Sequence, residues 1–305
     1  MGEGAPPDIL TRLDDLAGWI DDRAGLVLGV DFDGTLAPIT DDPSESTPSP
    51  ASLVALEELA ETPSVGLALV SGRGADDLRE RVGIEGVVYA GNHGLELRYG
   101  DREIVHPDAE RDRPALRRVI DEIDERLGDV PGYEMEDKGV TATVHFRRTP
   151  DDLVPTVVAT VDAVAGDVDG VRVTRGKQIR ELRPRVDWHK GRTMQLLSDA
   201  VPDGWGSMYV GDDVTDEDAF RAVGPTGIGV RVDDGDDGDG ATETDATYRI
   251  DGQPRVAKLL AWIAISFSWA RLLDVRSDPW RTFLADRSDL WGTSRRAEAG
   301  QMPFD

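Results

Sequence analysis

The chain has 305 residues, 39% of them hydrophobic, which is enough for one large domain or two ordinary ones with a sizeable core. It contains no cysteine, which excludes disulfides, thiolate catalysis and a cysteine-ligated zinc site. Aspartate and glutamate number 60 against 34 lysines and arginines, and the resulting net charge of −26 disfavours binding to nucleic acid or to anionic membranes.

The acid excess is spread through the chain instead of being confined to a tail. Charge repulsion opposes compaction in dilute buffer, whereas about 1 M salt shortens the Debye length to roughly 3 Å and removes most of that repulsion. We therefore expect a halophilic protein of a salt-rich cytoplasm. The N-terminal MGEGAPPD has acidic residues where a secretory signal would have basic residues. The most apolar segment, Leu259–Ala270, is too short to span a membrane and is predicted to be a buried helix.

The first third of the sequence alternates helices with short apolar strands. Apolar residues recur at helical spacing in some segments and run without interruption in others. This alternation is typical of βαβ units and a parallel sheet. The predicted elements are a helix at 8–24, a strand at 26–30, a helix at 52–60, a strand at 65–70, a helix at 75–82 and a strand at 87–90.

After residue 95 the pattern changes to strands in which apolar and polar residues alternate, as is typical of an antiparallel sheet. We expect strands at 95–99, 133–137 and 141–146, helices at 113–127 and 154–164, and a hairpin of 171–174 with 178–182 that has Gly176 in its turn. Residues 104–186 are therefore interpreted as an α+β insertion with its own small sheet.

The parallel pattern then resumes, with a helix at 190–197, strands at 208–210 and 227–232, and a helix at 256–275. The acidic run at 233–240 is expected to be a surface loop, and the tail at 276–305 to be peripheral. The predicted fold class is α/β. A Rossmann-like parallel sheet with helices on both faces is formed by 1–103 and 187–275, and the insertion at 104–186 is a second domain.

Two aspartates, Asp31 and Asp33, directly follow the first apolar strand. Their spacing can turn both side chains into the crevice beyond the strand, where open α/β sheets bind ligands. One could act as a nucleophile, the other could transfer protons, and both could hold a hard cation. A solvated acidic turn would explain an isolated pair equally well. Gly34 permits a tight turn, and Thr35 adds a hydroxyl and an N–H.

Three further polar clusters occur in the parallel part: Ser71-Gly72-Arg73 after the second strand, Lys190 at a helix start, and Asp212-Asp213 after a later strand. Each alone could be a helix cap, a solvated lysine or a turn. Together they supply what phosphoryl transfer requires. At about 4 Å, like unit charges repel by roughly 4 kcal/mol at an effective dielectric constant of 20, so a carboxylate nucleophile needs Mg²⁺ and a lysine to approach a phosphate.

The four clusters, DFDGTLAPI at 31–39, SGR at 71–73, Lys190 and GDDVTDEDAF at 211–220, resemble the four motifs of the haloacid dehalogenase superfamily of phosphatases. Within it, the chain resembles the trehalose-6-phosphate phosphatase family. The stretches that carry this closer resemblance are GNHGLE at 91–96, EDKGVTATVHFR at 136–147, GKQIRELRP at 176–184 and WHKG at 188–191.

The resemblance implies that Asp31 is the nucleophile, forming an aspartyl-phosphate, and that Asp33 protonates the leaving sugar oxygen and then activates water. It also implies that Mg²⁺ is held by Asp31, the main-chain carbonyl of Asp33 and Asp212, with support from Asp213 and Asp216. The implied phosphate-binding residues are Thr35, Ser71, Gly72, Arg73 and Lys190. The implied sugar-binding residues are Glu136, Lys138, Arg147 and Glu181 from the insertion, which would act as a cap, and His93 from the core.

The expected function is Mg²⁺-dependent hydrolysis of trehalose 6-phosphate to trehalose and phosphate by a cytoplasmic monomer, in trehalose biosynthesis and with functional coupling to a trehalose-phosphate synthase. One alternative is a phosphatase of the same design for another sugar phosphate, such as sucrose phosphate or a mannosyl-glycerate phosphate. Another is a sugar phosphomutase, which would pass the phosphate to a sugar. A third is a non-catalytic partner of a trehalose-phosphate synthase.

Overall fold

The computed structural model describes residues 5–40, 43–176, 178–233, 243–270 and 280. The chain divides into two compact units, one formed by Met1–Glu103 with Trp188–Asp305 and the other by Ile104–Asp187. The acidic run from 234 to 240, residues 271–275 and the tail, apart from Trp280, lie outside the described residues.

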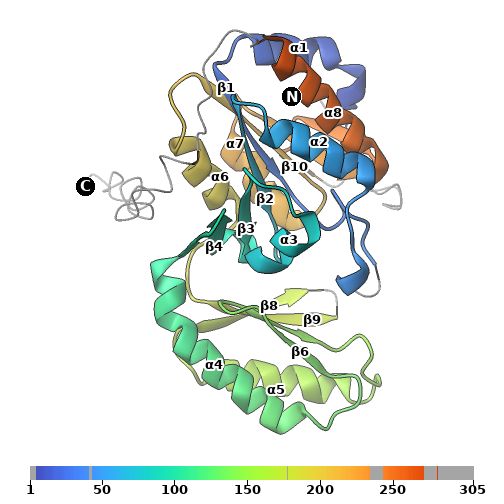
Figure 1. The fold of residues 1–305 in the computed structure, drawn as a ribbon. Helices are drawn as coiled ribbons and strands as arrows, with labels where there is room; N and C mark the ends of the chain where they lie inside the picture. The colour runs from blue at the N-terminus through green and yellow to red at the C-terminus, as the bar shows by residue number, and fades with distance from the viewer. Residues whose placement is uncertain (1–4, 41–42, 177, 234–242, 271–279, 281–305) are drawn as a thin grey trace, which may run out of the picture. The chain divides into compact units, whose positions relative to one another are not determined.

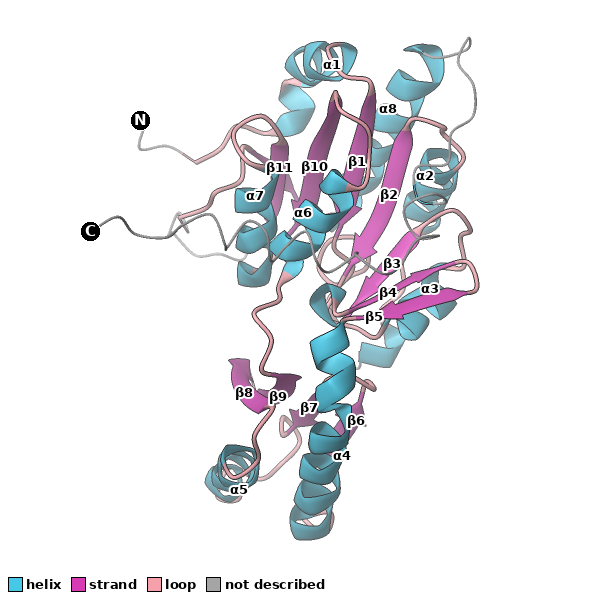
Figure 2. Ribbon diagram, turned by 90° about the vertical axis from the view of Figure 1, so that its left-hand side faces the viewer, coloured by secondary structure: helices cyan, strands magenta, loops and turns pink. Residues whose placement is uncertain are grey.

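The first unit is built on an eight-stranded sheet in the order β12-β11-β10-β1-β2-β3-β4-β5 (Figure 2). The strands from β12 to β3 are parallel to one another, and β4 runs antiparallel to β3. The strands are β1 (Gly25–Val30), β2 (Val65–Val70), β3 (Val88–Gly91), β4 (Glu96–Tyr99), β5 (Arg102–Val105), β10 (Trp205–Gly211), β11 (Ile228–Asp233) and β12 (Tyr248–Asp251).

Helices cover both faces of this sheet, so the predicted Rossmann-like α/β fold is confirmed (Figures 1 and 2). On one face α1 (Leu13–Asp21), α2 (Pro50–Ala60), α3 (Ala75–Val82) and α8 (Gln253–Ala270) pack on leucine and valine side chains of the strands. On the other face lie α6 (Lys190–Asp199) and α7 (Glu217–Val223). Every residue of β1 is buried, which explains why this strand is an unbroken apolar run in the sequence.

The second unit has a four-stranded antiparallel sheet in the order β6-β7-β9-β8. Its strands are β6 (Glu134–Asp137), β7 (Ala142–His145), β8 (Val171–Gly176) and β9 (Ile179–Pro184). Helices α4 (Pro107–Leu127) and α5 (Val154–Gly166) pack together with one face of the sheet, including Ala142, Val144 and Leu182. Among the described residues of the first unit, short 3-10 helices lie at Ile9–Thr11, Pro43–Glu45, Asn92–Gly94 and Val214–Asp216.

Several element boundaries differ from the predictions. Helix α4 begins at Pro107, before the predicted start at residue 113. Its first two turns are mostly charged, so little apolar periodicity marks the helix before Leu116. Gly176 is the last residue of β8 and not part of the turn. It pairs with Ile179, whose side chain approaches so closely that a Cβ at position 176 would lie 2.5 Å from it. Strands β5 and β12 and helix α7 were not predicted.

Helix α8 begins at Gln253, three residues before the predicted start, and lies with its apolar side in the core of the first unit. Within the described part of the chain, no helix is both long enough and apolar enough to cross a lipid bilayer.

Candidate active site

The loop after β1 carries Asp31 and turns back sharply at Gly34, which has φ +82°. The amides of Leu36 and Ala37 both donate to the carbonyl of Phe32, and these bonds close the turn. A Cβ at Gly34 would lie 2.0 Å from a carboxylate oxygen of Asp212, so only glycine fits at this position.

This turn brings Thr35 next to β10, where its hydroxyl donates to Asp212 Oδ1 at 3.1 Å. Because β1 and β10 are adjacent parallel strands, the loops at their carboxyl ends meet at one edge of the sheet. The acidic residues of two sequence motifs far apart in the chain are thereby brought together.

Lys190, the first residue of α6, lies between two of these carboxylates and is only 3% exposed. Its Nζ donates to Asp31 Oδ1 at 2.8 Å and to Asp216 Oδ1 at 2.7 Å. Asp216 is held by two further bonds, from the Tyr209 hydroxyl to Oδ1 at 2.7 Å and from the Asp213 amide to Oδ2 at 2.9 Å. Asp216 therefore accepts three hydrogen bonds from protein donors, whereas Asp31 accepts one from Lys190 and Asp212 one from Thr35.

Burial and like charges shift the pKa values of this cluster. Burial raises the pKa of Asp31 well above its ordinary value, although Lys190 opposes the shift. Burial and then the charge of Asp216 raise the pKa of Asp212 to about 7. Burial alone would lower the pKa of Lys190, but the charges of Asp216 and Asp31 outweigh it and raise this pKa, so the amine stays cationic.

The donor set fits a divalent cation. One carboxylate oxygen from each of Asp31, Asp212 and Asp216 lies within 4.8 Å of the others. Three carboxylates face one ammonium group, which leaves an excess of negative charge that a cation would relieve. Hard divalent cations prefer such oxygen ligands, and Asp31 and Asp212 could hold one best because Asp216 already accepts three hydrogen bonds. Asp213 instead accepts from the Val214 amide, as the cap of a 3-10 helix.

Ser71, Gly72 and His93 lie together beyond β2 and β3. The carbonyl of buried Ser71 accepts from the His93 amide at 2.7 Å, and a Cβ at Gly72 would lie 3.1 Å from the His93 ring. The carbonyl of His93 accepts from the Thr193 hydroxyl of α6 at 3.0 Å. Because Lys190 is in the same helix, this contact ties the predicted phosphate-binding serine and the predicted sugar-binding histidine to the helix that carries the lysine.

Glu96 connects the turn at Asn92–Gly94 to α3. Its Oε1 accepts from the Ala75 amide at 2.6 Å and from the Asn92 side-chain amide at 2.9 Å. Burial raises the pKa of Glu96, with the nearby charges of Glu103 and Asp76 adding to the effect. The GNHGLE stretch therefore acts locally to fix the conformation around His93, whose φ is +59°.

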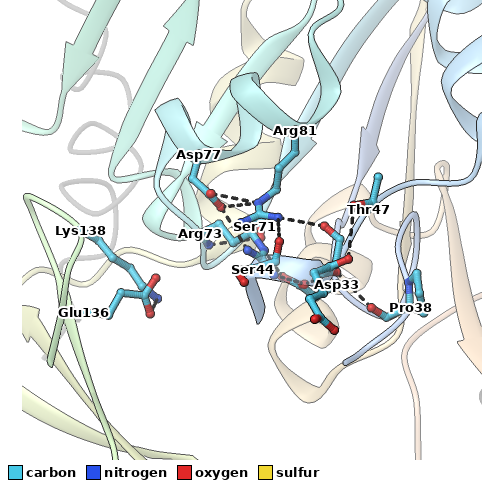
Figure 3. A network of polar contacts seen from close by, with 12 residues as sticks. Asp33, Pro38, Ser44, Thr47, Ser71, Arg73, Asp77, Arg81, Glu136 and Lys138 are labelled. Carbon is cyan, nitrogen blue, oxygen red and sulfur yellow. Dashed lines mark hydrogen bonds and ion pairs between the residues drawn. The ribbon is translucent and has the colours of Figure 1, made fainter. Parts of the chain in front are cut away.

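The side chain of Asp33 binds Arg73 (Figure 3). The bond is bidentate, with Arg73 Nε 2.7 Å from Oδ2 and Nη2 2.7 Å from Oδ1. The Ser46 hydroxyl lies 3.1 Å from the same Oδ1. The guanidinium of Arg73, predicted to be near the phosphate, is thus engaged with the carboxylate predicted to transfer protons.

In the second unit, Glu136, Thr143, Glu181 and Thr174 are directly opposite one another across all four strands. The neighbouring residues in these strands, such as Val144 and Leu182, face the helices, so this row lies on the face of the sheet away from them. Glu136 Oε2 is 3.6 Å from Lys138 Nζ, and Figure 3 includes this pair. Arg147 is exposed just beyond the end of β7.

Sequence reasoning missed several residues that hold these groups. Tyr209 precedes Gly211-Asp212 by two to three positions in a buried strand, so it was read only as core. Thr193 lies three residues after Lys190 on the same helix. Asp77 and Arg81, four residues apart on α3, carried the signal of an i,i+4 ion pair but gave no indication that they extend the Asp33–Arg73 contact.

Comparison with known proteins identifies the family. A profile of the trehalose-phosphatase family matches residues 29–254. The trehalose-phosphate phosphatase of Mycobacterium marinum is 40% identical over 243 residues, which cover 78% of this chain and 61% of that protein. The chain thus spans about three fifths of the length of the curated relative it matches.

Solved structures show the same fold. A trehalose-6-phosphate phosphatase related protein aligns with a TM-score of 0.69 and 22% identity, covering 80% of this chain and 100% of that one. The C-terminal domain of Candida albicans trehalose-6-phosphate phosphatase aligns with a TM-score of 0.67 and 24% identity, covering 86% of this chain and 99% of that one. Since the family profile covers most of the sequence and the acidic cluster after β1 and β10 lies within it, the chain belongs to the trehalose-phosphatase family.

Proposed function

We propose that this chain is a Mg²⁺-dependent phosphatase that hydrolyses trehalose 6-phosphate to trehalose and inorganic phosphate. The observation that carries the proposal is the buried contact of Lys190 with Asp31 and Asp216, beside Asp212, in a member of the trehalose-phosphatase family. In this arrangement a carboxylate, a fixed ammonium group and a second carboxylate converge, as phosphoryl transfer requires.

Asp31 is the proposed nucleophile. Its carboxylate oxygen attacks phosphorus, the bond from phosphorus to the sugar oxygen breaks, and an aspartyl-phosphate is left on the enzyme. Lys190 favours the anionic form of Asp31 and offers positive charge to the phosphate oxygens. Mg²⁺, held by Asp31, Asp212 and the main-chain carbonyl of Asp33, would neutralise the charge of the phosphate. Asp216 keeps Lys190 in place, and Asp213 supports Asp216 through its amide.

Asp33 is the proposed proton carrier. It gives its proton to the leaving sugar oxygen in the first step and becomes a carboxylate. In the second step it takes a proton from the water that attacks the aspartyl-phosphate, which restores its protonated form and frees Asp31. The bidentate contact with Arg73 fits the anionic form of Asp33 that exists between these two steps.

Hydroxyl and amide groups near the cluster are the proposed phosphate ligands, namely Thr35, Ser71 and the main chain of Gly72, with Arg73 close by. For the second unit we propose the role of a cap whose sheet binds the sugar. The row containing Glu136 and Glu181, with Lys138 beside it, presents carboxylates and an ammonium group that can bond several hydroxyls of a polyol. Arg147 and His93 complete the proposed sugar-binding set.

A panel of phosphate esters tests this function. We expect kcat/KM for trehalose 6-phosphate to exceed that for sucrose phosphate, mannosyl-glycerate phosphate and glucose 6-phosphate, and we expect activity to be lost when EDTA removes Mg²⁺ and to return when Mg²⁺ is added back. The products should be trehalose and inorganic phosphate in equal amounts. A ranking of trehalose 6-phosphate behind glucose 6-phosphate would refute the substrate, and transfer of phosphate to a sugar in place of water would indicate a phosphomutase.

The acid excess supports a further part of the proposal, that the protein works in a salt-rich cytoplasm. A net charge of −26 implies strong self-repulsion that dissolved ions screen. The melting temperature is therefore expected to rise between dilute buffer and molar KCl, measured with Mg²⁺ held constant. A melting temperature that falls over this range would refute the adaptation without affecting the proposed chemistry.

A further inference from the structure

Arg81 of α3 is anchored to several acceptors at once (Figure 3). Its Nε lies 2.9 Å from each carboxylate oxygen of Asp77, one helical turn earlier, and its Nη1 lies 3.0 Å from the carbonyls of both Ser44 and Ser46. The side chain is 17% exposed, although an arginine on a surface helix would ordinarily extend into solvent. Arg81 therefore fixes the segment around Ser44 and Ser46 to helix α3.

Asp77 shares its carboxylate between two arginines. Besides Arg81, it accepts from Arg73 Nη1 at 3.1 Å. That contact uses one corner of the Arg73 guanidinium and directs the opposite edge, Nε and Nη2, at Asp33. The Phe32 ring, whose centroid is 5.2 Å from Arg73 Cζ, limits the guanidinium from another side.

Ser46 provides a second connection to the same carboxylate. Its hydroxyl lies 3.1 Å from Asp33 Oδ1 and 3.0 Å from the carbonyl of Pro38, and its own carbonyl is held by Arg81. Arg81 thus reaches Asp33 along two paths, one through Asp77 and Arg73 and the other through Ser46. Two arginines and two aspartates alternate along the first path, so each guanidinium lies between carboxylate groups.

We infer that Asp77 and Arg81 are positioning residues that hold Arg73 and Ser46 against Asp33 and so fix where the Asp33 carboxylate lies. This inference rests on the proposed function, in which Asp33 gives a proton to the leaving oxygen and recovers one from water. Neither Asp77 nor Arg81 touches Asp33, and their effect passes through Arg73 and Ser46.

The leaving group provides a readout that a purely structural role would not change. The sugar oxygen is a poor leaving group and needs a proton, whereas the phenolate oxygen of p-nitrophenyl phosphate leaves without one. A variant in which Asp33 is poorly positioned should therefore lose more activity on trehalose 6-phosphate than on p-nitrophenyl phosphate. The ratio of the two kcat/KM values is independent of the fraction of folded enzyme, so partial unfolding of a variant does not affect it.

The variant Arg81→Gln removes the anchor, and Arg79→Gln is the matched control. Arg79 lies on the same helix, and its side chain is 42% exposed and forms a 4.0 Å ion pair with Asp101, so its loss removes the same charge outside the network. For Arg81→Gln we expect kcat/KM for trehalose 6-phosphate, divided by kcat/KM for p-nitrophenyl phosphate, to fall about tenfold. This is less than the full contribution of a general acid, because Asp33 itself remains. For Arg79→Gln the ratio should equal that of the wild type.

An Arg81→Gln enzyme that loses activity equally on both esters, or on neither, would overturn the positioning role. The proposed function fails in a different way: the wild type would then not hydrolyse trehalose 6-phosphate in the presence of Mg²⁺, and the inference would fall with it. Because the wild-type assay is read before any variant is compared, the two failures are distinguishable.

Discussion

Replacing Asp31 by asparagine is expected to reduce kcat on trehalose 6-phosphate to less than about a thousandth of the wild-type value, the scale seen when a nucleophile is removed from an enzyme. Asparagine has nearly the same shape but a neutral amide that does not displace the sugar oxygen from phosphorus. The measurement is steady-state release of inorganic phosphate at saturating substrate and Mg²⁺.

The fold should survive this change. Lys190 retains its 2.7 Å contact with Asp216, and a buried carboxylate with a strongly raised pKa is replaced by an uncharged group. We expect the circular-dichroism spectrum and the melting temperature of Asp31→Asn to stay close to those of the wild type. Residual activity above a few per cent in a folded variant would remove Asp31 from the role of nucleophile.

Replacing Lys190 by methionine is expected to cost stability as well as activity. The lysine is buried between Asp31 and Asp216, and its removal leaves two carboxylates in a low-dielectric site without their counter-charge. Breaking a buried ion pair in this way destabilises proteins by about 3–5 kcal/mol. Urea unfolding followed by fluorescence should therefore give a clearly smaller free energy of unfolding, and phosphatase activity should be lost.

The exposed Lys258 of α8 serves as the control, because Lys258→Met removes the same charge without leaving a carboxylate buried. Because the pKa of Lys190 is raised in the folded protein, its contribution to the free energy of unfolding is fully present at pH values below the ordinary lysine pKa. That contribution is lost only as the pH rises through the raised pKa. The deficit of Lys190→Met should thus be present throughout the neutral range. Equal free energies of unfolding for Lys190→Met and Lys258→Met would contradict the buried contact.

Much of the core site could be predicted from the sequence because each of its residues occupies a position that the topology fixes. Asp31 and Asp212 directly follow buried parallel strands, and Lys190 begins the helix that packs beside them. The carboxyl ends of adjacent parallel strands meet at one edge, so the convergence of these groups follows from the order of strands and helices alone.

Contacts that depend on side-chain rotamers could not be predicted in this way. The sequence indicated that Asp33 and Arg73 both lie near the site, but not that the two side chains bind each other, because that choice depends on the rotamers of both. The row that joins Glu136 to Glu181 depends on the register of antiparallel strands. A slip of one residue in that register would turn the side chains of the shifted strand to the opposite face of the sheet. Strand β12 is four residues long and contains Arg249 and Asp251, so it carries no apolar run to reveal it.

Covalent catalysis by Asp31 is tested most directly by trapping the phosphorylated enzyme. Wild-type protein is mixed with ³²P-labelled trehalose 6-phosphate and Mg²⁺, quenched in acid within the first turnover, digested and analysed by mass spectrometry. The expected result is one labelled peptide that contains Asp31, with a label that hydroxylamine removes, as it does from acyl phosphates, and that is absent in Asp31→Asn. Rapid turnover without any labelled peptide, or a label on a residue other than Asp31, would contradict a covalent phosphoryl transfer through this carboxylate.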